Sequence, residues 1–168
     1  DDPLAGPGGR WSPAEAALGL ARSAEVLRAA ALHEASVSAI RMEAAAIQNA
    51  TSGPRARTGT LRRSIQGLAA AQGDGSIRIV LRAGGGASDL GYARVQEGPE
   101  GGGSHTVIRA KGDGWLTFRL PDGSFRRVKE VRIPATRFLE RAFTAEVQEL
   151  ENRLSAALET AARGVFGG

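Results

Sequence analysis

The sequence contains no cysteine, which excludes disulfides, thiolate nucleophiles and thiolate metal ligands. It contains only two histidines, His33 and His105, and neither has a metal-binding spacing from carboxylates or a nucleophile to activate. No apolar run approaches the ~20 residues of a membrane-spanning helix, and the first residues lack a basic-then-apolar signal pattern. We therefore expect a soluble protein with no catalytic residues, no metal, no cofactor and no membrane partner.

Aromatic residues and lysine are also scarce. Aromatic residues make up 5% of the chain, so a core must be built mainly from Leu, Ile, Val and Ala. Only Lys111 and Lys129 are lysines among the 22 basic residues, so the basic surface is nearly all arginine. Arginine suits interfaces because it binds carboxylates and phosphates bidentately, although a GC-rich genome would produce the same bias through codon usage. A net charge of +4 does not by itself indicate nucleic-acid binding.

The first part of the chain is predicted to be one long helix. Residues 1–11 are rich in Gly and Pro and are expected to form a flexible arm before a single domain over residues 12–168. Ser12-Pro13-Ala14-Glu15 indicates a capping box with proline at the first helical position. Helical apolar spacing then continues to about Ala50, at Leu20, Ala24, Leu27, Ala30, Val37, Ile40, Ala44 and Ile47. A helix on the order of 55 Å is more than one small domain can cover, so it either breaks near His33-Glu34 or packs on another subunit.

The middle of the chain alternates strand patterns with glycine-containing turns. Strands are predicted over residues 64–71 and 76–83 around the turn Gly73-Asp74-Gly75, and residues 92–97 are expected to be extended. Residues 84–86 and 98–103 are expected to be glycine-rich loops. A meander is predicted over 106–110, 115–120 and 124–133, with hairpin turns at 111–114 and 121–123. Neither face of its last strand is purely apolar, so this hairpin is expected to project from the core or cover a partner.

A final helix is predicted from about Thr136 to Arg163, with Gly164 ending it. Its apolar stripe consists of Leu139, Phe143, Val147, Leu150, Leu154, Leu158 and Ala161. The order of helix, antiparallel strands and helix predicts an α+β fold, with a long N-terminal helix and a C-terminal helix packed on an antiparallel sheet that carries a projecting hairpin.

A short segment, residues 57–65, lies between the long helix and the first strand. Thr58 is predicted to cap a turn of helix with its hydroxyl, and Gly59 to relax the backbone there. Leu61 and Ile65 are four residues apart and would share one face, while Arg62 and Arg63 would point outward. From these residues alone, the segment is predicted to be a capped connector between a helix and a sheet.

Three stretches, taken in order, carry a resemblance to a known family. They are Arg57-Thr58-Gly59-Thr60-Leu61-Arg62-Arg63-Ser64-Ile65, then Tyr92-Ala93 with Glu97-Gly98, then Ile133-Pro134-Ala135 with Phe138-Leu139 and Ala142. The ordered set resembles the head–tail joining and tail-completion proteins of tailed bacteriophages, small neck proteins also described as minor tail or virion morphogenesis proteins. This chain departs from the family pattern in two places. The family usually has an aromatic residue between the glutamate and the glycine and a threonine after that glycine, whereas this chain has Glu97-Gly98-Pro99. The family also tends to have Arg-Pro-Phe where this chain has Thr136-Arg137-Phe138.

The resemblance implies a structural virion protein that forms a ring, with six- or twelve-fold symmetry, where the portal or connector meets the tail. Its implied partners are further copies of itself and other neck, tail and connector proteins, with DNA passing through the lumen. Its implied location is the virion, after assembly in the host cytoplasm. The motif residues, as possible assembly-interface residues, are Arg57, Thr58, Gly59, Leu61, Arg62, Arg63, Ser64, Tyr92, Glu97, Gly98, Pro134, Arg137 and Phe138.

The residues agree with assembly, because a ring needs two different surfaces that meet on neighbouring copies. The alanine-striped long helix and the two-sided hairpin are candidates for these surfaces. Two alternatives remain open. One is a tail terminator ring that caps the tail tube. The other is a DNA-binding module that uses Arg55, Arg57, Arg62 and Arg63 on phosphates.

Overall fold

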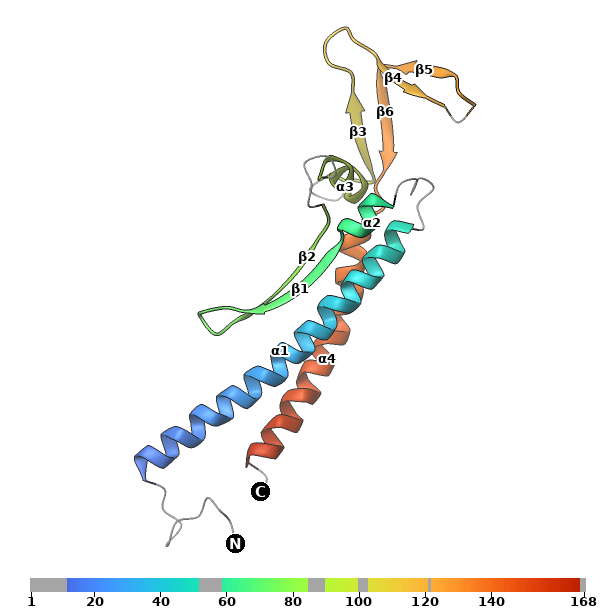
Figure 1. The fold of residues 1–168 in the computed structure, drawn as a ribbon. Helices are drawn as coiled ribbons and strands as arrows, with labels where there is room; N and C mark the ends of the chain where they lie inside the picture. The colour runs from blue at the N-terminus through green and yellow to red at the C-terminus, as the bar shows by residue number, and fades with distance from the viewer. Residues whose placement is uncertain (1–11, 52–58, 85–89, 100–102, 121, 167–168) are drawn as a thin grey trace. The chain divides into compact units, whose positions relative to one another are not determined.

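The computed structural model describes residues 12–51, 59–84, 90–99, 103–120 and 122–166 (Figure 1). It has the α+β fold predicted from the sequence, with long helices at both ends and antiparallel strands between them. The helices are α1 (Pro13–Thr51), α2 (Thr60–Ser64), α3 (Leu90–Glu97) and α4 (Phe138–Phe166). The strands are β1 (Gln66–Ala71), β2 (Ile77–Arg82), β3 (His105–Arg109), β4 (Leu116–Arg119), β5 (Phe125–Val128) and β6 (Glu130–Pro134). In the described residues they form three two-stranded sheets, β1-β2, β3-β6 and β4-β5.

The chain divides into two compact units. Unit 1 consists of Asp1–Glu43, Gly67–Leu81 and Phe143–Gly168, and unit 2 of Ala44–Gln66 and Arg82–Ala142. The single domain predicted for residues 12–168 stays a prediction. The expected arm over residues 1–11 lies outside the described residues.

Helix α1 begins at the predicted capping box. The Glu15 carboxylate accepts a hydrogen bond from Ser12 N at 2.8 Å, and Glu15 N donates to Ser12 Oγ at 3.2 Å. The Ser12 backbone amide first, and the Ser12 side chain second, hold the pKa of Glu15 below its ordinary value by hydrogen bonding to its carboxylate. The helix continues through His33 without the break considered above.

The side of α1 that is buried differs from the predicted stripe. In unit 1 the buried residues are Ser23, Ala35, Ser38, Ala39 and Met42, whereas Leu20 and Ile40 of the predicted stripe are each 66% exposed. Leu27, Ala30, Val37 and Ile47 of the stripe are half-buried, so the prediction is confirmed only in part. Alanines occur on several sides of α1, so apolar spacing alone did not identify the most buried side. Small buried residues let neighbouring backbone approach closely.

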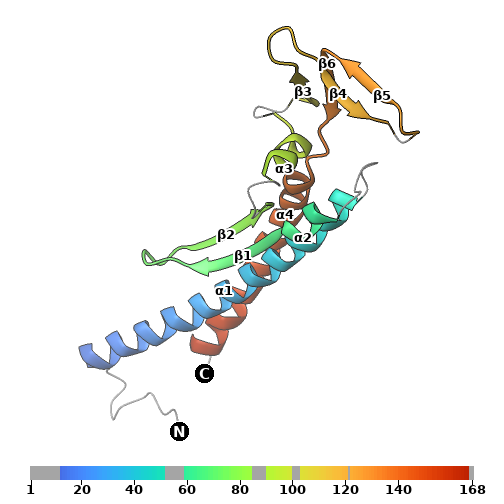
Figure 2. The ribbon, with the colours of Figure 1, turned by 45° about the horizontal axis from the view of Figure 1, so that its top comes forward.

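The β1-β2 hairpin shows where such a close approach occurs. Figures 1 and 2 show the hairpin lying along α1. A Cβ added at Gly67 in β1 would lie 2.0 Å from the Ala39 carbonyl oxygen, and Gly67 N donates to the Glu43 carboxylate at 2.8 Å. Ile77, Ile79 and Leu81 of β2 are half-buried and alternate with exposed residues, as predicted.

The hairpin turn is also as predicted. The Asp74 carboxylate accepts hydrogen bonds from the Ser76 hydroxyl at 2.7 Å and from Ser76 N at 2.9 Å. Chiefly the hydroxyl bond keeps the pKa of Asp74 below its ordinary value. Gly75 takes a positive φ of 90°, which glycine adopts without steric strain.

Helix α4 runs beside α1 in unit 1 (Figures 1 and 2). Val147, Leu150, Leu154, Leu158 and Ala161 of its predicted stripe are half-buried, but Phe143 is exposed. The helix begins at Phe138 and passes Gly164 to end at Phe166, so the predicted stop at Gly164 was wrong. Glycine tends to end a helix where it takes a positive φ, and Gly164 is not among the glycines that do.

Two predictions for unit 2 were also wrong. Residues 92–97, expected to be extended, lie in helix α3, which ends where Gly98 takes a φ of 101° and donates to the Arg94 carbonyl oxygen. The strand expected over residues 124–133 is divided at Lys129: β5 pairs with β4, while β6 pairs with β3. Residues 111–114 therefore connect two different sheets and form no hairpin, since β3 and β4 are not partners.

Candidate functional site

Most of the motif residues of the second and third stretches meet where α3 ends and α4 begins, within unit 2. The Glu97 carboxylate accepts hydrogen bonds from two backbone amides of the first turn of α4, Leu139 N at 3.0 Å and Glu140 N at 2.8 Å. A carboxylate at this position satisfies amides that have no partner inside the helix and interacts favourably with the helix dipole. Glu97 is therefore the N-terminal cap of α4, supplied from another helix.

The backbone on either side of Glu97 continues this junction. The Gln96 carbonyl oxygen accepts hydrogen bonds from Thr136 N at 2.7 Å and from Arg137 N at 3.2 Å. Arg137 takes a φ of 48°, and its guanidinium contacts the Gly103 carbonyl oxygen and the Glu140 carboxylate. A Cβ on Gly98 would lie 2.6 Å from Ala135 Cβ, so only glycine fits there without movement.

Phe138 begins α4 and is fully buried. Its carbonyl oxygen accepts a hydrogen bond from Asn49 Nδ2 at 3.2 Å, which joins the last turns of α1 to the junction. Pro134 ends β6, a few residues before Phe138. Tyr92 lies on α3. The structure thus brings Glu97, Gly98, Pro134, Arg137 and Phe138 together, and the contacts they make stabilise the fold.

The first motif stretch forms α2. Gly59 precedes this helix in the left-handed conformation, with a φ of 67°, and among the described residues no side chain caps the helix. Ser64 Oγ donates to the Leu61 carbonyl oxygen at 2.7 Å and accepts from Gly84 N at 3.0 Å. Ile65 is buried and Leu61 half-buried, while Arg62 and Arg63 are exposed, in agreement with the prediction. The proposed cap Thr58, with Arg55 and Arg57, lies outside the described residues.

A second surface lies in residues 105–134, which we call the β arm and which end at the motif residue Pro134. It comprises β3-β6, which lies next to α3, and the separate ribbon β4-β5 (Figure 1). Thr106 Oγ1 donates to the Val95 carbonyl oxygen of α3 at 3.0 Å. Lys129 forms the corner between the two sheets: its Nζ donates to the carbonyl oxygens of Asp113 and Gly114 and lies 4.5 Å from the centre of the Trp115 ring.

The β3-β6 sheet has one charged face and one apolar face. The register places Arg109, Glu130 and Arg132 on the same face, and Glu130 forms ion pairs with both arginines, at 3.0 Å and 2.9 Å. The hydrogen bonds from Arg132 first and Arg109 second keep the pKa of Glu130 below its ordinary value. On the other face lie Thr106, Ile108, Val131 and Ile133.

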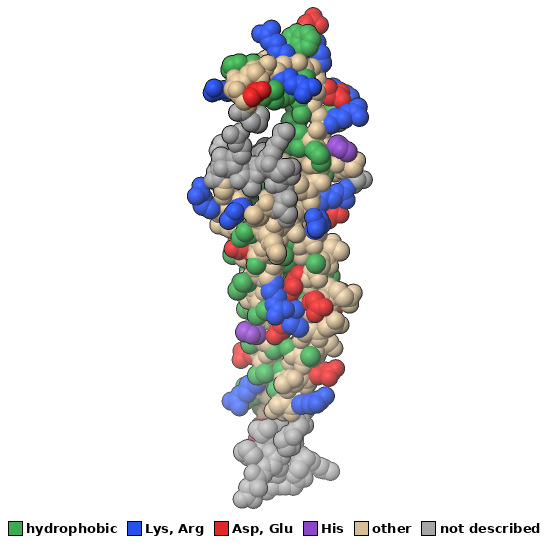
Figure 3. All heavy atoms as spheres, turned by 90° about the vertical axis from the view of Figure 1, so that its right-hand side faces the viewer, with side chains coloured by type: hydrophobic (Ala, Val, Ile, Leu, Met, Phe, Trp, Pro, Cys, Tyr) green, Lys and Arg blue, Asp and Glu red, His purple; other side chains and the backbone are tan. Residues whose placement is uncertain are grey.

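The β4-β5 ribbon carries arginine and phenylalanine on both of its faces. Phe118 lies opposite Arg126 on one face. Arg119 lies opposite Phe125 on the other, and Arg127 lies next to them. Both phenylalanines are exposed, Phe125 at 73%. In Figure 3 the blue basic and green hydrophobic side chains lie side by side over the top of the view, where the β arm is.

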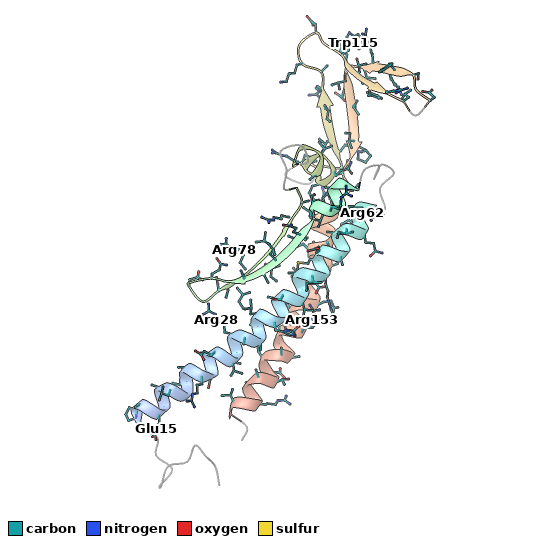
Figure 4. All side chains as sticks on the ribbon, in the orientation of Figure 1. Glu15, Arg28, Arg62, Arg78, Trp115 and Arg153 are labelled. Atoms are coloured by element: carbon teal, nitrogen blue, oxygen red, sulfur yellow. The ribbon has the colours of Figure 1, made fainter. Side chains whose placement is uncertain are left out.

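Unit 1 contains a largely buried charge network between α1 and α4. Arg153 of α4 forms ion pairs with Glu146 and with Glu34, the latter at 3.3 Å, and donates to the fully buried Ser38 hydroxyl. Figure 4 shows Arg153 on α4 beside α1. Chiefly the Glu146 hydrogen bond raises the pKa of Arg153, which stays charged. The network joins α1 to α4 in unit 1 through Glu34 and Ser38 of α1.

Among the described residues, no group of three or more His, Cys, Asp or Glu side chains is arranged to hold a metal ion. In the same part of the chain, no helix is long and apolar enough to cross a membrane. Comparisons with protein-family models, with curated proteins and with solved structures find no match to this chain.

Proposed function

We propose that the protein is a structural component of a bacteriophage virion, which assembles as a ring where the portal or connector meets the tail. The observation that carries this proposal is an apolar strip on α1 that the chain itself leaves exposed. In the described residues only three large apolar side chains are buried, Met42, Ile65 and Phe138, whereas twelve are exposed. A chain with this imbalance is expected to bury apolar surface against a partner.

The strip consists of Leu18, Val26 and Ile40, all exposed. Val26 and Ile40 lie eight and twenty-two residues after Leu18, which at about 100° per residue places them roughly 80° and 40° around the helix from Leu18. These three side chains therefore share one side of α1. The buried residues Ala35 and Met42 of unit 1 lie roughly 140–160° around the helix from the middle of this arc, so the strip is a second apolar surface on the same helix.

A second copy of the chain is the partner that we propose for this strip. A strip that meets a different surface on the next copy generates a closed ring when the rotation between copies closes, or a filament when it does not. The resemblance of the three ordered motif stretches to neck proteins favours the ring, with six or twelve copies. In this proposal the protein acts by assembly and carries out no reaction.

The location can be tested by electron microscopy of particles from the producing strain, labelled with gold-conjugated antibody to this protein. Label at the head–tail junction supports the proposal. Label at the ends of tails made without heads favours the alternative, a tail terminator ring. Absence of label from all particles would refute both virion roles.

The strip can be tested separately by light scattering on the purified protein. Ile40→Glu introduces a charge into the proposed contact and is expected to abolish or weaken self-association. Leu20→Glu is the matched control, since Leu20 and Ile40 are each 66% exposed. The twenty residues from Leu20 to Ile40 make about five and a half turns, so Leu20 lies on a different side of α1. Equal effects of the two substitutions would contradict the assignment of the strip.

A further inference from the structure

The β arm is one of two segments with a surplus of positive charge; the other, residues 44–73, has four arginines and no acidic residue. Residues 105–134 contain seven of the 22 basic residues and three of the 18 acidic ones, a surplus of four. The net charge of the whole chain is +4, so the remaining 15 basic and 15 acidic residues balance. The modest net charge of the whole chain therefore does not reveal this basic segment. A basic stripe on one element is typical of a surface that binds a polyanion.

The basic side chains of the arm are not equally able to bind a partner. Arg109 and Arg132 are paired with Glu130, and Lys129 donates to two carbonyl oxygens. In contrast, Arg119, Arg126 and Arg127 of the β4-β5 ribbon have no carboxylate within ion-pair distance in the described part of the chain. Arg119 donates to the nearby Gly123 carbonyl oxygen, at 3.3 Å.

The positions of these three arginines distinguish between kinds of polyanion. Arg126 lies on one face of the ribbon, and Arg119 and Arg127 lie on the other. An acidic protein surface would cover one face and leave the other charged and uncovered. The major groove of double-stranded DNA, about 12 Å wide, admits a two-stranded β ribbon and has a phosphate backbone on each side. A partner that encloses the ribbon accounts for arginines on both faces.

Two further features of the ribbon bear on this fit. Phe118 and Phe125 lie beside the arginines, where apolar side chains can contact sugars or thymine methyl groups. The one carboxylate of the turn, Asp122, is engaged by the hydroxyl and the backbone amide of Ser124, at 2.7 and 2.9 Å. It remains the only acidic group between Leu116 and Val128.

We infer that the β4-β5 ribbon binds the phosphate backbone of double-stranded DNA through Arg119, Arg126 and Arg127. This activity is independent of sequence, because phosphate contacts position a protein on DNA without reading its bases. It goes beyond the proposed assembly role, since an isolated chain would bind DNA whether or not it forms a ring. It also differs from the module around Arg55, Arg57, Arg62 and Arg63, which uses other residues.

The test is fluorescence anisotropy of a labelled 20-base-pair duplex titrated with the full chain at 50 and 200 mM salt. Three phosphate contacts give a slope of log affinity against log salt of about −2.7, so that affinity falls about 40-fold between the two concentrations. Replacing the three arginines together by alanine is expected to remove this salt dependence and most of the binding. Replacing all three by lysine is expected to keep most of both, because lysine preserves the charge.

Arg22→Ala, Arg41→Ala and Arg78→Ala, combined in one chain, are the matched control. These three arginines are exposed and lie in unit 1, and their loss lowers the net charge by the same amount. Circular dichroism confirms that each variant is folded. Retained binding in this control, with loss in the ribbon variant, supports the inference, whereas equal losses in both would show an effect of net charge and overturn it.

Two further probes decide the kind of partner. Polyglutamate bound as tightly as the duplex, and through the same arginines, would overturn the assignment to DNA in favour of an acidic protein. A single strand bound more tightly than the duplex would overturn the placement in the groove. Absence of binding to any probe at 50 mM salt would refute DNA binding and leave the proposed virion role intact, because labelling of particles tests that role separately.

Discussion

Replacement of Arg153 by methionine tests whether the charge network holds the two long helices together in unit 1. Arg153 contacts both Glu34 and Glu146, and the three side chains keep only 13–22% of their exposure. Methionine has a similar length and stays apolar, so the substitution removes the charge and its hydrogen bonds while keeping most of the packing. Two carboxylates would then remain close together without a cation, and the buried Ser38 hydroxyl would lose its donor.

The cost follows from the burial of these groups. Removing one partner of a fully buried ion pair costs about 3–5 kcal/mol, because the remaining charge is left unpaired. The glutamates here keep some contact with water, so we expect Arg153→Met to lower the free energy of unfolding by about 2–3 kcal/mol. Urea unfolding followed by far-ultraviolet circular dichroism measures this change, because both affected elements are helices.

Two companion variants make the result interpretable. Arg163→Met removes the pair with Glu159, which is exposed at 82% and 64%, and is expected to change stability by less than about 0.5 kcal/mol. Adding Glu34→Gln and Glu146→Gln to Arg153→Met removes the unpaired charges and is expected to restore much of the loss. If Arg153→Met were as mild as Arg163→Met, the network would contribute no more than a surface pair, and our account of it would be refuted.

The remaining predictions concern a cap, a close approach and a titrating group. Glu97→Ala removes the cap of α4 and is expected to lower the free energy of unfolding by about 1–2 kcal/mol. It is also expected to speed hydrogen exchange of the Leu139 and Glu140 amides. Glu149→Ala, on the exposed side of α4, is expected to change neither the stability nor these exchange rates. Gly67→Ala forces a Cβ against the Ala39 carbonyl oxygen and is expected to lower the free energy of unfolding in urea by about 1–3 kcal/mol. Gly73→Ala, where the added Cβ has open space around it, is expected to lower it much less. Equal losses would contradict the close packing of β1 on α1. The pKa of Glu130 is lowered in the folded chain. The ionised Glu130 therefore stabilises the fold at pH values above 4.5, the ordinary pKa of the group, and this stabilisation is lost as the pH falls through the lowered pKa. A carboxyl-carbon titration by nuclear magnetic resonance checks this directly, and an unshifted Glu130 would show that the ion pairs with Arg109 and Arg132 do not persist in solution.

Local signals predicted the elements that depend on neighbouring residues. The capping box at Ser12 and Glu15 and the turn at Asp74 were predicted because the side chains involved bond to backbone only two or three residues away. A running count of charge along the chain would also have identified the basic surplus of residues 105–134. The total of +4 concealed it.

The sequence by itself determined the α+β class, the long terminal helices, the turn at residues 73–75 and the basic surplus of residues 105–134, because each depends on residues close together in the chain. Only the tertiary structure decided that residues 90–97 form a helix, whose Glu97 caps a helix more than forty residues away. It also decided that the strand divides at Lys129 and which side of the alanine-rich α1 is buried. In all three cases several local conformations or orientations were similar in energy, and hydrogen bonds or packing between distant segments selected one of them.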